Sequence, residues 1–290
     1  MSTKLKSNTF SNAIVFGAAG AMGQMIQRML ASGGHHVVGA DLVTAPEVES
    51  ADLSQLTPSW KEALGHADLV VLAVPDDVAV ENGGAIANIL KPNALLVDCT
   101  SIKAPYVAAI SNIGECGLLS INPLFGPGLS WTNRTIAVTD IRRVLITDTW
   151  INFLRTSGVS VLPLSPEKHD LLASEAQASI HAFLIAYCSI LSKETISFDT
   201  PPSVLVLSMG ARLLKGEPHV YWGIQKLNPF AKKARKNIIA ALAEIDRIVK
   251  ADEYDEFLRL LDEMNTNLGD CRSYYANRCL KLFNSISSDE

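Results

Sequence analysis

The sequence predicts an α/β N-terminal domain, built on a mostly parallel doubly wound sheet, followed by an all-α domain. In the first half, short apolar runs that suit buried strands alternate with helical patterns. In the second half, the alternation stops and apolar residues recur at helical spacing. Because Pro163 and Pro166 interrupt the pattern, we expect one domain over residues 1–165 and a second over 166–290.

The expected elements follow in order along the chain. Each expected strand is apolar on both faces, which is typical of a parallel sheet covered by helices on both sides. The strands are expected at 13–16, 36–40, 69–74, 94–97 and 118–121, with 136–138 and 144–146 as candidates to extend the sheet. The first helix is expected at 22–30, a buried helical stripe from Ile180 to Leu191, and long helices at 231–250 and 253–268.

Composition excludes several classes of protein. With 48% apolar and 19% charged residues, the chain can bury a core. A net charge of −5 argues against a general nucleic-acid binder. No apolar run approaches the ~20 residues of a membrane span, and the N-terminus lacks the apolar core of a signal peptide. We therefore expect a cytoplasmic protein with neither membrane nor nucleic acid as partner. The cysteines and histidines show no disulfide or metal-site spacing, so no metal is expected.

A glycine-rich loop follows the first strand and opens the first helix. Small residues there let the backbone turn tightly and approach a pyrophosphate at the helix N-terminus. Asp41, at the end of the second strand, would accept hydrogen bonds from the adenosine ribose and repel a 2′-phosphate, which favours NAD over NADP. A helix-packing glycine turn with a surface aspartate, or a different nucleotide such as FAD, stays open. The candidate cofactor residues of the loop are Gly17, Ala19, Gly20, Ala21, Met22 and Gly23.

Polar residues follow two neighbouring strands where ligands bind in open α/β sheets. The fourth strand runs out into residues 98–103 and the fifth into 122–128. Lys103 could pair with an anionic substrate, and Ser101 could donate a hydrogen bond near a nicotinamide. Loops at strand ends are commonly polar, so a structural role fits each residue as well.

The second half carries further candidates. Asp170, Ser174, Gln177 and His181 have the spacing of one helix face, which could equally be a solvated face. Arg212 is a single arginine in an apolar stretch. Either it binds a ligand, or the aliphatic part of its side chain packs against apolar residues while the guanidinium stays in solvent. Tyr221 and Trp222 fit packing or an interface better than substrate contact.

Taken together and in order, these pieces resemble the prephenate dehydrogenase family. The resemblance implies an NAD(P)-binding Rossmann domain followed by a helical domain that forms the homodimer. It also implies an oxidoreductase that removes hydride and carbon dioxide from a cyclohexadiene dicarboxylate. The matching segments are GxxGxMG at 17–23, Val74-Pro75, Asp98-x-x-Ser101-x-Lys103, PLFGP at 123–127, His169-Asp170, Gln177-Ala178-x-x-His181 and MGARL at 209–213.

The resemblance also assigns roles. It implies that Arg212 binds a substrate carboxylate and that Ser101 and His181 line the site as catalytic residues. Asp170 and Gln177 would line the substrate or lie behind the lining groups. It further implies that Lys103 contacts the substrate and that Tyr221 or Trp222 approaches the partner subunit's site. Val74, Pro75 and Ser101 would contact the cofactor.

The chain departs from the family at position 122. The family has His-Pro where this sequence has Asn122-Pro123, and that histidine takes the proton of the substrate's 4-hydroxyl. An amide cannot be a general base, and losing one typically costs ~10²–10⁴-fold. A 4-amino substrate needs no such base, because its nitrogen lone pair can expel the hydride.

Three functions are compatible with this substitution. The favoured one converts 4-amino-4-deoxyprephenate to 4-aminophenylpyruvate, CO2 and NADH, in the biosynthesis of antibiotics or other secondary metabolites. The alternatives are prephenate or arogenate oxidation in aromatic amino acid biosynthesis, and a non-catalytic relative that only binds NAD.

Residues 131–134 are a second departure. They could reshape the mouth of the pocket, Arg134 could add charge for a carboxylate, or the segment could be a surface loop. Thr132 is the candidate substrate-binding residue of this segment.

Overall fold

The computed structural model describes residues 10–196, 198 and 200–286. The chain forms two compact units. Unit 1 comprises Met1–Ala173 with Lys226–Asn228, and unit 2 comprises Ser174–Gln225 with Pro229–Glu290. The division after Ala173 falls within the helical segment that follows Pro166, whereas the sequence pattern placed it after residue 165.

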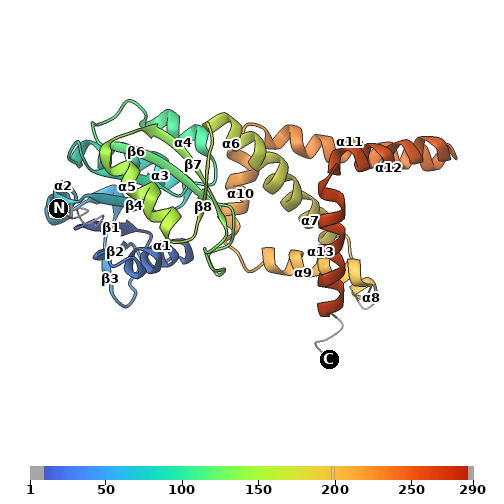
Figure 1. Cartoon of the computed structure of the whole chain (residues 1–290), viewed down its shortest axis with the longest axis horizontal. Coiled ribbons are helices and arrows are strands. Elements are labelled where there is room, and N and C mark those ends of the chain that lie inside the picture. Colours follow the sequence, from blue (N-terminus) through green and yellow to red (C-terminus); the bar gives the residue numbers. More distant parts are fainter. Residues whose placement is uncertain (1–9, 197, 199, 287–290) are drawn as a thin grey trace, which may run out of the picture. The chain divides into compact units, whose positions relative to one another are not determined.

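Unit 1 is built on an eight-stranded sheet of order β3-β2-β1-β4-β5-β6-β7-β8 (Figure 1). Every neighbouring pair is parallel except β6 and β7. This confirms the predicted mostly parallel doubly wound sheet. The strands are β1 (Ala13–Phe16), β2 (Val37–Asp41), β3 (Val48–Ser50), β4 (Leu69–Leu72), β5 (Leu95–Asp98), β6 (Gly117–Pro123), β7 (Thr135–Arg142) and β8 (Ser160–Pro163).

Helices cover both faces of this sheet, and each face has its own hydrophobic cluster. Because strand side chains alternate between faces, Leu69 and Val71 of β4 join one cluster and Val70 and Leu72 join the other. The first cluster includes side chains of α1 (Ala21–Ser32) and α5 (Leu145–Thr156). The second includes side chains of α2 (Pro58–His66), α3 (Asp76–Ile89) and α4 (Lys103–Ile110). The remaining elements of unit 1 are η1 (Leu53–Gln55) and α6 (Pro166–Ala173).

Three details of the expected sheet need correction. Residues 144–146 are not a strand, because α5 begins at Leu145 and the Val144 backbone N–H donates to the Thr147 hydroxyl at 3.1 Å. A short apolar run fits a buried helix turn as well as a strand. The short strands β3 and β8 escaped prediction because each lacks a run of buried apolar residues.

Unit 2 is helical in its described part, as predicted. Its elements are the π-helical turn η2 (Ser174–Ala178), α7 (Ser179–Ser189), α8 (Lys193–Ile196), α9 (Pro201–Leu213), α10 (Pro218–Leu227), α11 (Ala231–Lys250), α12 (Tyr254–Leu268) and α13 (Cys271–Ile286). The expected bounds of α11 are met, and α12 begins one residue later than expected.

The sequence predicts that the apolar stripe between Ile180 and Leu191 is buried, but several of its residues are exposed. Leu184 is buried, but Ile180 and Phe183 are exposed and Ile190 is 80% exposed. Helical periodicity identifies residues that share a face, but it does not show what covers that face. Within the described residues, the helical run Pro166–Ser189 is long and apolar enough to cross a membrane, by length and composition only. An apolar helix of a water-soluble protein can have the same length and composition.

Candidate active site

The glycine-rich loop between β1 and α1 leaves no room for side chains at two positions. Gly17 has a φ of 78°, and a Cβ there would lie 2.1 Å from the Ala73 carbonyl oxygen. A Cβ at Gly23 would lie 2.1 Å from the carbonyl oxygen of Gly17. The backbone of the loop therefore packs directly against α1 and against the segment that follows β4.

The N-terminus of α1 suits a phosphate. Gly20 is the N-cap and has no side chain to cap the helix, and the first turn holds no acidic residue. The free N–H groups and the positive end of the helix dipole together favour an anion. Asp41, at the end of β2, accepts hydrogen bonds from Ala19 N at 2.9 Å and from Val43 N at 3.0 Å. The fold thus brings the predicted loop and the predicted ribose-binding carboxylate together, an arrangement that fits a dinucleotide.

Asp76 holds the loop that follows β5, a role that the sequence analysis missed. Its carboxylate accepts hydrogen bonds from Ser101 N at 3.0 Å and from Ile102 N at 3.2 Å. Burial raises the pKa of Asp76 from 3.8 to about 6. Val74 and Pro75, predicted as cofactor contacts, precede it, and Pro75 is the N-cap of α3. The position of Ser101, a predicted catalytic residue, is therefore set by its backbone contact to α3.

Lys103 is not available to a substrate, which corrects the role predicted for it. Its side chain is 0% exposed, and Nζ donates to the carbonyl oxygens of Thr100 and Ile121, each at 2.7 Å. Nζ also lies 3.9 Å from Oδ1 of Asp98, which is buried as well. Burial lowers the pKa of Lys103 and raises that of Asp98. The lysine is an internal cation that ties the ends of β5 and β6 together.

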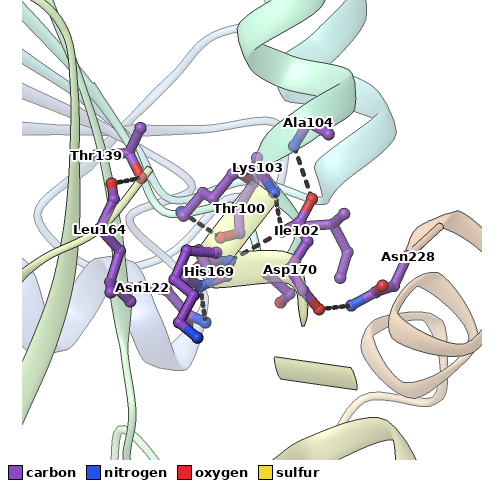
Figure 2. A network of polar contacts seen from close by, with 12 residues as sticks. Thr100, Ile102, Lys103, Ala104, Asn122, Thr139, Leu164, His169, Asp170 and Asn228 are labelled. Carbon is purple, nitrogen blue, oxygen red and sulfur yellow. Dashed lines mark hydrogen bonds and ion pairs between the residues drawn. The ribbon is translucent and has the colours of Figure 1, made fainter. Parts of the chain in front are cut away.

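Asn122, at the end of β6, lies in a buried polar network (Figure 2). Its Nδ2 lies 3.0 Å from Nε2 of His169, and Nδ1 of His169 lies 2.8 Å from Oδ1 of Asp170. All three side chains are buried, Asn122 at 6% exposure. His169 is a residue that the sequence analysis quoted as part of a motif but did not place in the site.

Asp170 anchors this network to α4. Its two carboxylate oxygens accept hydrogen bonds from the backbone N–H groups of Lys103 at 2.8 Å and Ala104 at 2.9 Å. The N-cap of α4, Ile102, has no side chain that could accept these bonds. Asn228 donates to the Asp170 carbonyl oxygen at 2.8 Å. Asp170 is therefore a buried cap of the α4 N-terminus. Because its side chain is fully buried, Asp170 does not line a substrate site itself.

Unit 2 carries the other predicted residues. Two polar atoms are buried there without a hydrogen-bond partner in the described part of the chain, Oε1 of Gln177 and Nδ1 of His181. The ring of His181 meets that of Tyr221 edge to face at 4.9 Å, and burial lowers the pKa of His181. Arg212 is exposed on α9, and Trp222 is exposed on α10. Because η2 is π-helical, the α-helical spacing assumed from residue 174 to 181 does not hold.

The departure at residues 131–134 lies in unit 1. Trp131 packs against the first hydrophobic cluster. The guanidinium carbon of Arg134 lies 6.0 Å from the centre of the Phe125 ring, and its Nε donates to the Ser130 carbonyl oxygen at 2.9 Å. Thr132 N donates to the Ser130 hydroxyl at 3.3 Å. These contacts account for the loop's own conformation, and a role of Thr132 in substrate binding stays a prediction.

Comparisons with known proteins add independent findings. Residues 24–141 match the family of the prephenate dehydrogenase nucleotide-binding domain. A 4-amino-4-deoxyprephenate dehydrogenase of Streptomyces pristinaespiralis is 28% identical over 96% of this chain and 98% of its own length. A probable arogenate/prephenate dehydrogenase of Methanocaldococcus jannaschii is 27% identical over 90% of this chain and 62% of its own length. The crystal structure of A. aeolicus prephenate dehydrogenase with hydroxyphenyl propionate and NAD+ has a TM-score of 0.73 at 19% identity, covering 90% of this chain and 98% of that one.

Proposed function

Because residues 24–141 belong to the nucleotide-binding domain of the prephenate dehydrogenase family, we propose that this protein oxidatively decarboxylates a prephenate-like dicarboxylate whose ring carries a 4-amino group. The expected family and enzyme class, an NAD-dependent dehydrogenase, are confirmed. The amino substrate is our proposal. The reaction converts 4-amino-4-deoxyprephenate and NAD+ to 4-aminophenylpyruvate, CO2 and NADH.

The cofactor is NAD, and the residues of unit 1 fit it. Gly17 and Gly23 allow the loop to pack closely against the segment after β4 and against α1, and the uncapped N-terminus of α1 offers N–H groups to the pyrophosphate. Asp41 favours a free ribose hydroxyl over a 2′-phosphate at this position. When bound, NAD supplies the hydride acceptor.

The observation that carries the choice of substrate is the amide at position 122. Asn122 is buried at the end of β6 and cannot take a proton from a 4-hydroxyl. An amine avoids that requirement. The nitrogen lone pair of the substrate forms a C=N bond as the C4–H electron pair leaves as hydride. The electrons of the C1–carboxylate bond then enter the ring, CO2 departs, and the iminium becomes an aniline.

The residues of unit 2 serve to bind the dicarboxylate. The exposed guanidinium of Arg212 can bind a carboxylate through two hydrogen bonds. His181 and Gln177 each carry a buried polar atom without a partner, which favours a ligand that satisfies them. Because burial lowers the pKa of His181, its imidazole is neutral at physiological pH and can donate to or accept from that ligand.

We also propose that the protein is a cytoplasmic homodimer that associates through the helices of unit 2. Large apolar side chains of α11 and α12 are exposed in the single chain, including Ile239, Leu242, Val249, Leu258 and Met264. Contiguous exposed apolar surface is typical of a protein–protein interface. Sedimentation analysis should give twice the mass of the chain, and a monomer at micromolar concentration would contradict this proposal.

A substrate comparison tests the function. We expect NADH formation with 4-amino-4-deoxyprephenate, and a kcat/KM with prephenate lower by about 10² or more, the usual cost of a missing base. Asn122→His is the matched variant and should raise turnover of prephenate. Equal or faster oxidation of prephenate or arogenate by the parent protein would refute the amino substrate. Binding of NAD without turnover of any cyclohexadiene acid would identify a non-catalytic relative.

A further inference from the structure

We infer that His169 is a positioning residue that holds the Asn122 amide with its carbonyl oxygen toward the substrate amine. The inference rests on the proposed function, because the orientation matters only if an amine is oxidised. It follows from the direction of three hydrogen bonds in unit 1, which can be traced one by one in Figure 2.

The first step fixes the proton on His169. Oδ1 of Asp170 already accepts the N–H of Lys103 at 2.8 Å, and Oδ2 accepts the N–H of Ala104. Both donors belong to the first turn of α4, and each of them occupies one oxygen of the carboxylate. A carboxylate can only accept, so Nδ1 of His169, 2.8 Å away, carries the proton and donates it.

The second step fixes the amide. A neutral imidazole that is protonated on Nδ1 has an acceptor at Nε2. The group 3.0 Å from Nε2 is Nδ2 of Asn122, which therefore donates. The amide plane is then held with Oδ1 turned away from the ring. Within the described residues, the hydrogen bond of the Asn122 side chain is made through Nδ2, so Oδ1 can accept one from a ligand.

The third step gives the chemical consequence. An amine that donates one N–H to Oδ1 of Asn122 keeps its lone pair for the bond to C4. The reversed amide would present Nδ2, which would donate to that lone pair and withhold it from the ring. His169 thus selects the orientation of Asn122 that permits the electron push. It acts on the substrate only through its hydrogen bond to Asn122.

Two variants separate this role from a structural one. In His169→Leu nothing accepts from Nδ2, so the amide can reverse. In His169→Gln, Oε1 can take the place of Nε2 as acceptor. With 4-amino-4-deoxyprephenate, we expect His169→Leu to lower kcat about tenfold, the equivalent of one hydrogen bond of about 1.4 kcal/mol. KM and the Kd for NAD should stay near those of the parent. His169→Gln should recover most of the lost kcat.

A spectroscopic measurement reads the orientation directly in the unmodified protein. In protein labelled with ¹⁵N at histidine, the ring of His169, identified as the signal missing from His169→Gln, should show a proton on Nδ1 and none on Nε2 at neutral pH. A protonated Nε2 would mean that Oδ1 of Asn122 faces the ring, and would overturn the inference.

The outcomes distinguish the inference from the function on which it rests. If the parent does not oxidise the amino substrate, the function fails, whereas the ring-nitrogen spectrum still decides the orientation. If the parent is active but His169→Leu keeps the parental kcat, positioning by His169 is refuted. It is also refuted if His169→Gln folds and loses as much kcat as His169→Leu. Should His169→Leu not fold, the Gln variant and the spectrum decide.

Discussion

Replacing Lys103 with methionine should destabilise unit 1 severely without a direct effect on substrate binding. Methionine has a similar length and no charge. The substitution leaves the buried Asp98 carboxylate without its counter-charge and removes the donor to two buried carbonyl oxygens. Breaking a buried pair by removing one partner costs about 3–5 kcal/mol. We expect a loss of that size in the free energy of unfolding of Lys103→Met.

The loss in the free energy of unfolding should depend on pH, because the buried Asp98 carboxylate titrates. Burial already raises the pKa of Asp98, and removing Lys103 takes away the charge that opposes this shift. A group whose folded-state pKa is raised contributes stability at low pH that is lost as the pH rises through the folded pKa. The destabilisation of Lys103→Met should therefore be larger at about pH 8 than at about pH 5.

Urea unfolding followed by intrinsic fluorescence measures this effect, with Lys91→Met as the matched control. Lys91 forms an ion pair with Asp68 at 2.7 Å, but the two side chains are 41% and 24% exposed. A surface pair of this kind contributes about 0–1 kcal/mol. If Lys103→Met unfolds within about 1 kcal/mol of the parent while KM for the dicarboxylate rises strongly, then Lys103 reaches the substrate and the structural role is refuted.

Four further substitutions test the cofactor site, the titration of Asp76 and the carboxylate contact. Gly23→Ala places a Cβ 2.1 Å from the Gly17 carbonyl oxygen, so calorimetry should show a Kd for NAD raised about tenfold or more; an unchanged Kd would contradict this. Asp76 has its pKa raised from 3.8 to about 6, so its contribution to stability falls by about 2 kcal/mol between pH 4 and pH 7. Asp76→Asn should lack that fall, as measured by unfolding at both pH values. Asp41→Ala should relax the preference against NADP, whereas an unchanged ratio of kcat/KM values would assign ribose recognition to another residue. Arg212→Ala should raise KM strongly; an unchanged KM would place Arg212 outside the substrate site.

The central sheet could be predicted because its strands are buried on both faces. Val70 and Val71 of β4 face opposite clusters, so both positions must be apolar, and the run is visible in the sequence. The edge strands β3 and β8 carry no such signal, because their side chains are largely exposed. At residues 144–146 the apolar run belongs to the start of a helix, a distinction that a short run cannot make.

The glycine-rich loop could be predicted for a related reason. Gly17 and Gly23 are required by backbone contacts that no other residue type allows, so their spacing carries the geometry. Lys103 shows the opposite situation. A lysine after a strand is compatible with a solvated side chain, a ligand contact or an internal cation. The three differ only in what surrounds Nζ, and here the carbonyl oxygens of Thr100 and Ile121 surround it.

His169 could not be assigned from the sequence for the same physical reason. Its partner Asn122 is 47 residues away, and they meet because β6 ends beside the helix that begins at Pro166. Neither residue alone indicates the pairing, since an asparagine at a strand end and a histidine beside an aspartate are both ordinary features. The sequence does show that the base expected at position 122 is missing. What replaces it is a matter of orientation, because an amide offers a donor on one side and an acceptor on the other. The proton on Nδ1 of His169 decides which side faces the substrate, so the substitution at position 122 can only be interpreted together with His169.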